Sequence, residues 1–154
     1  MQNEFFFRNN KMSVTLEACL PKYDSLEDFE KDFPDEFLKD DSRVGNYLRA
    51  LLIKYDKDPS AISKKARLSI SYVGLITNWK KNNPSRDALI AICLAIGTTF
   101  EEAQYLLKYA GQAPLYVRRR RDVVIWFGFM KGQDVDTVND NLYARGMKTL
   151  TKKE

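Results

Sequence analysis

The sequence predicts an all-α protein, and three features of the 154-residue chain carry that prediction. Apolar residues recur at spacings of three, four and seven in successive segments, which is the period of helices that bury one face. Residues typical of helix ends bracket these segments, with Ser, Thr or Asp before them and Gly after them. No stretch combines strict alternation with the turn residues of a β-hairpin. We therefore expect a fold built from helices alone.

An acidic N-terminal extension, residues 1–41, is expected to form one or two short helices. Ser25, followed three residues later by an acid, is a helix-start pattern. Apolar residues then recur at helical spacing in this segment, at Leu26, Phe29, Phe33 and Phe37. We expect the three phenylalanines to pack the extension.

A central domain, residues 42–111, shows five helical segments. The first carries an apolar stripe made of Val44, Tyr47, Leu48, Leu51, Leu52 and Tyr55. The second is short, with Asp58 suited to cap it and Pro59 to open it. Its core-facing residues are Ile62 and Ala66. The expected limits of the other three are Ser69 or Ser71 to Thr77, Ser85 to Gly97, and Thr98 or Thr99 to Gly111.

Residues 112–154 are expected to form a basic linker and a helical extension packed on the central domain. The segment 121–132 is apolar on nearly every side, which predicts a buried helix. A last helix is expected to start at Asp136 and to close at Gly146. Its inward residues are expected to be Val138, Leu142 and Tyr143.

The composition excludes several kinds of chemistry. The chain has no histidine and two cysteines, Cys19 and Cys93, so histidine-based triads and histidine-containing or four-thiolate zinc sites are excluded. We expect two free thiols, no metal and no cofactor. No paired carboxylates, phosphate-binding loop or nucleophile–base pair indicates an enzyme. No apolar run approaches the roughly 20 residues of a membrane span, and no signal peptide is evident, so we expect a cytoplasmic protein.

Charge is distributed unevenly along the chain. Residues 1–41 contain five Lys or Arg against eleven Asp or Glu, a net charge of −6, so residues 42–154 carry +10 of the total of +4. A basic body favours polyanions. The acidic extension has three interpretations: it folds back on the body, it binds a basic partner, or it is a solvated face.

The central domain also resembles a known family. The stretch ISKKARLSISYVGLI carries the apolar skeleton of a helix-turn-helix at Ile62, Ala66, Leu68, Val73 and Ile76. With the following NPSRDALIAICLAIGTTFEEA, residues 44–110 resemble the repressor-type helix-turn-helix family, the xenobiotic-response-element class that includes phage lambda repressor. The remaining chain is similar to small bacterial or phage regulators. Arg67 stands at the turn position that the family often gives to glycine, and Pro59 where a phosphate-binding polar residue is common.

The resemblance implies that the third helix enters the DNA major groove while basic loops hold phosphates. The base-facing positions are then Ser69, Ile70, Ser71, Tyr72 and Leu75. The phosphate-binding positions are Lys64, Lys65, Arg67, Asn78, Lys80, Lys81, Asn83 and Arg86. A further basic patch consists of Arg118, Arg119, Arg120 and Arg121. No Arg, Gln or Asn stands in the first turns for bidentate base readout.

Each of these residues also has a structural interpretation. The two serines that open the third helix are ordinary cap residues, Tyr72 suits packing beside Trp79, and the lysines suit a solvated loop. The arginine patch either binds a nucleic-acid backbone or forms ion pairs with the acidic extension. Arg121 and Asp122 alternatively form an internal ion pair that positions the helix after them.

Two functional hypotheses follow. The first is a sequence-specific, DNA-binding transcription regulator that acts as a homodimer on double-stranded DNA. The last two helices either supply the dimer contact or only cover the core, through Trp126, Phe127, Phe129 and Met130. The second hypothesis is a protein-interaction module of the same fold, whose third helix and acidic extension bind a protein partner rather than DNA. The third helix would do so through Ile70, Tyr72, Gly74 and Leu75.

Overall fold

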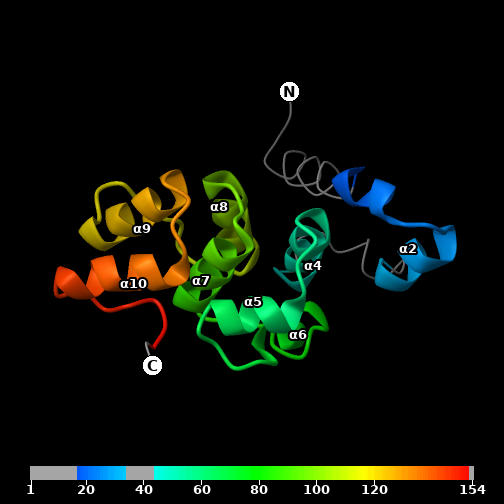
Figure 1. Cartoon of the computed structure of the whole chain (residues 1–154), viewed down its shortest axis with the longest axis horizontal. Coiled ribbons are helices and arrows are strands. Elements are labelled where there is room, and N and C mark those ends of the chain that lie inside the picture. Colours follow the sequence, from blue (N-terminus) through cyan, green and yellow to red (C-terminus); the bar gives the residue numbers. More distant parts are fainter. Residues whose placement is uncertain (1–16, 34–43, 153–154) are drawn as a thin grey trace.

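In the computed structural model, residues 17–33 and 44–152 are described, and every regular element in these two ranges is a helix. The all-α prediction is therefore confirmed for the described part of the chain. The expected contribution of Phe37 lies outside the described residues. The elements are η1 (Leu20–Lys22), α2 (Leu26–Asp32), α4 (Val44–Lys54), α5 (Pro59–Lys65), α6 (Tyr72–Thr77), α7 (Arg86–Ile96), α8 (Phe100–Tyr109), α9 (Arg120–Met130) and α10 (Val135–Ala144) (Figure 1).

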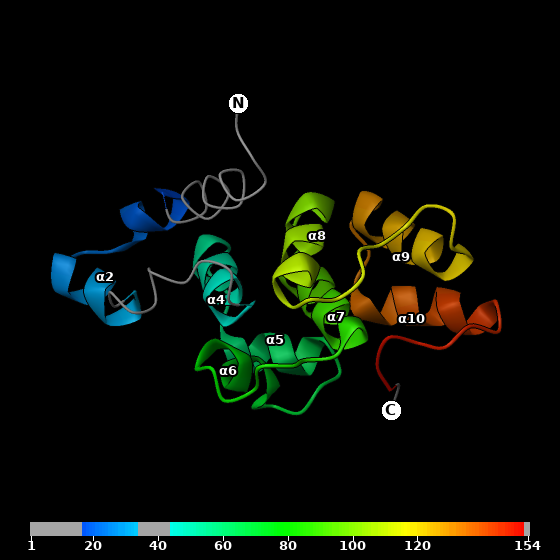
Figure 2. The same ribbon diagram turned by 180° about the vertical axis from the view of Figure 1, so that it is seen from behind.

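Helix α7 forms the centre of the molecule. Every residue from 88 to 96 is buried, because α5, α8 and α10 all pack against this helix. Helices α4 and α5 both pack on α6, below α8 in the view of Figure 1. The same order is visible from behind, with α9 and α10 at one end and α2 at the other (Figure 2).

Local capping signals are placed as expected. The N-cap side chains accept hydrogen bonds from backbone amides in the first turn at Ser25, Asp58, Ser85 and Thr99. Gly97 ends α7 with φ of 85°, a left-handed conformation that favours glycine. These features depend only on neighbours in the sequence, which is why the pattern predicts them.

Glu102 joins α8 to the end of α4. Its carboxylate accepts hydrogen bonds from Lys54 Nζ at 2.7 Å, Tyr55 OH at 2.6 Å and the Thr99 amide at 2.9 Å. Burial alone raises the pKa of Glu102, but these hydrogen bonds outweigh burial and hold the pKa below its ordinary value. Burial raises the pKa of Tyr55, and its hydrogen bond to the Glu102 carboxylate raises that pKa further.

Helix α2 is attached to α4 by one face. Phe33 is buried in the core, and Phe29 packs against it with ring centroids 5.1 Å apart. Arg49 of α4 donates a hydrogen bond to the Asp32 carbonyl at 2.7 Å. Leu26 does not continue this apolar face, because its side chain is 67% exposed.

The helix over segment 121–132 is not buried, contrary to prediction. Phe127 is 50% exposed and Met130 is 63% exposed. The reason is position: α9 lies at the edge of the molecule, and its main packing partners are α8 and α10 (Figure 1). Trp126 stacks on Phe100 with ring centroids 4.0 Å apart, so part of its apolar surface does cover the core.

The last helix also differs from prediction. Asp134, not Asp136, caps α10 by accepting a hydrogen bond from the Thr137 amide. Tyr143 is 78% exposed, although it was expected to face inward. The buried stripe of α10 runs through Val138 and Leu142, and Tyr143 lies about 100° further round the helix.

Both cysteines are buried free thiols. Burial raises the pKa of Cys19 to about 11 and that of Cys93 to about 12. The thiolate, which is the reactive form, is therefore disfavoured at both positions.

Candidate nucleic-acid interface

Helices α5 and α6 are joined by a tight turn. The amides of Arg67 and Leu68 donate to the carbonyls of Lys64 and Ser63, which satisfies the last carbonyls of α5. Arg67 has φ of 64°, in the left-handed region. This is the position where the family resemblance places a glycine, so the turn carries some backbone strain.

Ser63 fixes the angle between the two helices. Its side chain is fully buried, and Oγ donates to the Pro59 carbonyl at 2.9 Å while accepting from the Val73 amide at 3.0 Å. This bond satisfies one of the amides at the start of α6 that lack a helical partner. Sequence reasoning missed Ser63, because its partner Val73 lies ten residues away and no local pattern links them.

The other end of α6 rests on α4. Trp79 Nε1 donates to Asn46 Oδ1 at 2.9 Å. A Cβ atom at Gly45 would lie 2.5 Å from the Ile76 carbonyl oxygen and 2.7 Å from Trp79 Cδ1, so only glycine allows this approach. The ring of Tyr72 lies under the Lys81 ammonium group, whose Nζ is 5.0 Å from the ring centroid.

The residues expected to face bases lie at and just before the start of α6. We call the segment 69–71 the leading edge of α6. Ser69, Ile70 and Ser71 are exposed and lie before the first helical residue, whereas Tyr72 and Leu75 are half-buried. Ser71 is the N-cap residue but makes no side-chain capping bond. Its backbone is in the right-handed helical region and not in the extended conformation of a capping residue, and Ser63 accepts the Val73 amide in its place.

Most of the expected phosphate ligands are exposed and lie before or after this edge in the sequence. Lys64, Lys65, Lys80 and Asn83 are exposed, and Asn78 is exposed with its Oδ1 accepting the Lys80 amide. The whole stretch 59–86 contains six Lys or Arg and no Asp or Glu. The cations of this stretch favour a polyanion, and Asp134 and Asp136 at the start of α10 are the acids that lie near two of them, Lys65 and Arg67.

Three arginines expected to contact nucleic acid form ion pairs with carboxylates of the protein. Arg67 forms a bidentate pair with Asp136 of α10, at 2.9 and 2.8 Å. Arg86 donates to both carboxylate oxygens of Asp122 and to two carbonyls of the linker before α9. Arg121 forms a bidentate pair with Asp87. The charges of these three arginines are therefore already neutralised by the protein.

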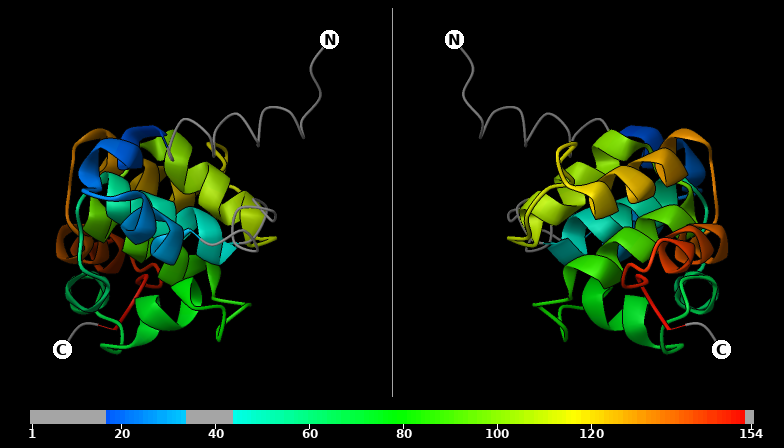
Figure 3. Two further views of the ribbon diagram at one scale, coloured as in Figure 1. Left: turned by 90° about the vertical axis from the view of Figure 1, so that its right-hand side faces the viewer. Right: turned by 90° about the vertical axis from the view of Figure 1, so that its left-hand side faces the viewer.

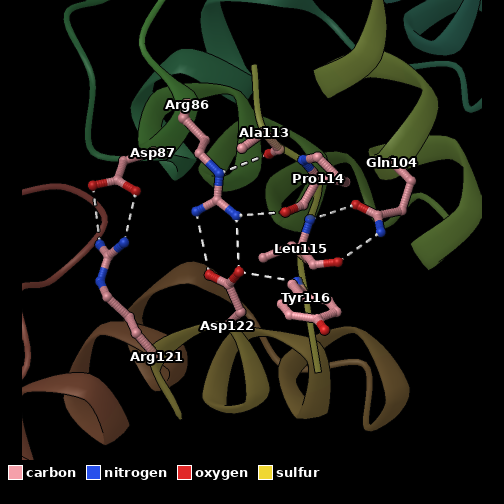
Figure 4. A network of polar contacts seen from close by, with 9 residues as sticks. All are labelled: Arg86, Asp87, Gln104, Ala113, Pro114, Leu115, Tyr116, Arg121 and Asp122. Atoms are coloured by element: carbon pink, nitrogen blue, oxygen red, sulfur yellow. Dashed lines mark hydrogen bonds and ion pairs between the residues drawn. The ribbon is translucent and has the colours of Figure 1, made fainter. Parts of the chain in front are cut away.

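The last two pairs form a reciprocal clamp between the first turns of α7 and α9 (Figure 4). Consecutive residues Arg86 and Asp87 pair with Asp122 and Arg121, so each helix gives one cation and one anion. Asp122 is buried and also accepts the Tyr116 amide at 2.9 Å. Arg121 and Asp122 thus form internal ion pairs that position α9, but each pairs with a residue of α7 and not with the other.

The remaining arginines of the basic patch, Arg118, Arg119 and Arg120, are exposed. They precede or open α9, which lies on the opposite side of α7 and α8 from α6 (Figure 1). The patch and the lysines around α6 therefore do not form one continuous stripe.

No family model, curated protein or solved structure matches this chain. Within residues 17–33 and 44–152, no helix is long and apolar enough to cross a membrane. The same ranges contain no group of three or more Cys, Asp or Glu side chains placed to hold a metal ion.

Proposed function

We propose that this protein is a DNA-binding transcription regulator of the helix-turn-helix type, with α6 as the helix that enters the major groove. One observation carries the proposal: the acid-free stretch 59–86 forms two short helices joined by a tight turn, with an exposed polar edge between lysines. This arrangement supports a repressor-type mode of DNA binding, in which residues at the start of the second helix contact base edges.

Base contact rests on the leading edge of α6. The hydroxyls of Ser69 and Ser71 hydrogen-bond base edges, and the Ile70 side chain contacts a thymine methyl group. None of these side chains makes a bidentate contact, so direct readout is weak. Much of the specificity then comes from DNA shape and deformability.

Phosphate contact rests on the lysines. Lys64 and Lys65 end α5, and Lys80 and Lys81 follow α6, so the two pairs flank the leading edge along the chain. The start of α5 does not contribute, because Asp58 occupies it and its carboxylate accepts the Ala61 amide. Binding therefore depends strongly on salt, since each phosphate contact releases counterions.

The protein acts as a homodimer in this proposal. Phe127 and Met130 give α9 an exposed apolar surface, which suits contact with a second copy. A two-fold dimer reads two half-sites about one helical turn apart.

A titration of the full chain against duplex DNA from its own promoter tests the proposal. We expect Lys80→Glu with Lys81→Glu to abolish binding at low salt. A matched control, Lys57→Glu with Lys131→Glu, changes the net charge equally at exposed sites outside residues 59–86 and is expected to retain most of the binding. Equal loss in both variants would show that net charge alone, and not this surface, drives binding.

The alternative is a protein-interaction module, and the exposure of Ile70 favours it. An isoleucine that is 60% exposed on a leading edge suits an apolar pocket of a partner as well as a thymine methyl. Ile70→Asp distinguishes the two functions. Loss of a co-purifying partner, with no DNA binding by the unaltered protein, would favour the interaction module.

A further inference from the structure

A groove of about 510 Å³ lies between the start of α9 and the segment after α10. Aliphatic side chains that include Val117 and Val124 line it, and three arginines stand around it, Arg118, Arg120 and Arg145. An occupant of this groove needs both apolar surface and negative charge, because burying an unpaired guanidinium is costly.

Two of these guanidinium groups are unused. Among the residues that the structure describes, Arg118 and Arg120 have no hydrogen-bond or ion-pair partner, and Arg145 donates only to the Asn141 carbonyl. The next residue in the chain, Arg121, is fully engaged with Asp87. The groove therefore offers cations that the molecule itself does not neutralise.

Helix α2 carries the matching chemistry. Residues 17–33 contain six Asp or Glu and two Lys, a net charge of −4. Leu26, Glu27 and Glu30 are all exposed, and their spacing of one and four places them on one side of the helix. Phe29 and Phe33, three and seven residues after Leu26, lie next to it around the helix and hold α2 against α4, whereas Glu27 and Glu30 lie farther round and are exposed.

The two surfaces cannot meet within one molecule while α2 stays on α4. Helix α2 lies at one end of the long axis, and α9 and α10 lie at the other (Figures 1 and 2). The end-on views show the same separation, with α2 facing the viewer in one and α9 and α10 in the other (Figure 3).

We propose that α2 of one molecule docks into the α9–α10 groove of a second copy. Leu26 lies on the aliphatic floor, and Glu27 and Glu30 pair with Arg118 and Arg120. This contact joins different surfaces of identical chains, so it repeats head to tail and builds rows of molecules. The buried area is small, which makes the contact weak and salt-sensitive. The inference goes beyond the proposed function, because it needs neither DNA nor α6.

Sedimentation velocity of the full chain over a concentration series tests the contact. At about 50 mM salt we expect species larger than a dimer, and at about 500 mM salt we expect them to disappear. Glu27→Lys with Glu30→Lys, or Arg118→Glu with Arg120→Glu, each weakens this growth about tenfold or more. The control Lys57→Glu with Lys131→Glu leaves the growth intact.

Mixing the two charge-reversed variants gives the sharpest result. Neither variant alone is expected to grow beyond a dimer, but each carries a surface complementary to the other, so the mixture is expected to recover the large species. Unchanged circular dichroism and melting temperature show that the variants are folded. Leu26→Asp, at an exposed site, provides a second variant that leaves the charges of the groove unchanged and also blocks growth.

Three results would overturn the inference. The chain stays at or below a dimer at every concentration in low salt, the charge reversals leave growth unchanged, or the mixture fails to recover it. If Arg118→Glu with Arg120→Glu abolishes DNA binding while no growth is found, the groove serves a nucleic-acid backbone instead.

Discussion

The clamp between α7 and α9 predicts a large loss of stability on Arg86→Ala. The variant removes four hydrogen bonds and leaves the Asp122 carboxylate with only the Tyr116 amide. The Asp122 side chain is 3% exposed, so water cannot replace the lost partner. Breaking such a buried pair costs about 3–5 kcal/mol of unfolding free energy. For a chain of this length, the melting temperature falls on the order of 10 °C.

Urea unfolding at pH 7, followed by far-ultraviolet circular dichroism, measures this loss. Arg67→Ala is the matched comparison, because its pair with Asp136 is also bidentate but exposed, and we expect it to cost about 1 kcal/mol or less. A double-mutant cycle with Asp122→Asn isolates the coupling within the buried pair. A loss below about 1 kcal/mol for Arg86→Ala, or zero coupling in the cycle, would refute the clamp as a stabilising element.

Three further predictions concern the contacts that hold α4, α5, α6 and α8 together. Ser63→Ala leaves the Val73 amide buried without its acceptor and is expected to cost about 1–3 kcal/mol, whereas exposed Ser60→Ala changes unfolding free energy by less than about 0.5 kcal/mol. Gly45→Ala forces a clash with the Ile76 carbonyl and is expected to lower the melting temperature. Gly74→Ala, where a Cβ meets nothing within 4 Å, is expected to raise the unfolding free energy by about 0.5–1 kcal/mol. A Gly45 variant that is more stable than the Gly74 variant would contradict the packing of α6 on α4. Because the pKa of Glu102 is lowered in the folded state, its contribution is fully present above the ordinary value of 4.5 and is lost as the pH falls through the folded pKa. Glu102→Gln is therefore expected to reduce stability at pH 7 and to flatten the acid limb of a pH–stability curve, and an unchanged acid limb would count against this account.

Local signals in the sequence predicted the helical framework well. Asp58, Ser85 and Thr99 cap their helices as expected, because an N-cap needs only the amide three residues ahead. The apolar stripe of α4 is buried for the same reason, since one helix face is enough to define it.

Contacts between distant residues could not be predicted in this way. Arg86 and Asp122 lie 36 residues apart, so nothing near Arg86 indicated that it faces inward and not toward a phosphate. The exposure of Phe127 has a similar cause. An apolar sequence predicts that a helix packs against other elements, but it does not determine how many faces of that helix are covered.

Of the residues that the sequence suggested for the candidate interface, some are exposed and others pair inside the protein. The exposed serines and lysines stand where the pattern placed them, at Ser69, Ser71, Lys64, Lys65 and Lys80. Arg67, Arg86 and Arg121 pair instead with carboxylates of the protein, because an arginine binds a carboxylate as well as it binds a phosphate. Charge counts along a sequence do not distinguish the two.

The salt dependence of DNA binding tests the central claim, that the lysines around α6 hold phosphates. We predict a steep negative slope of log binding constant against log salt for the unaltered chain. In Lys80→Gln with Lys81→Gln the slope is expected to be shallower by about 1.8, which corresponds to two lost phosphate contacts. An identical slope in the two proteins, or no binding at about 50 mM salt, would contradict the account.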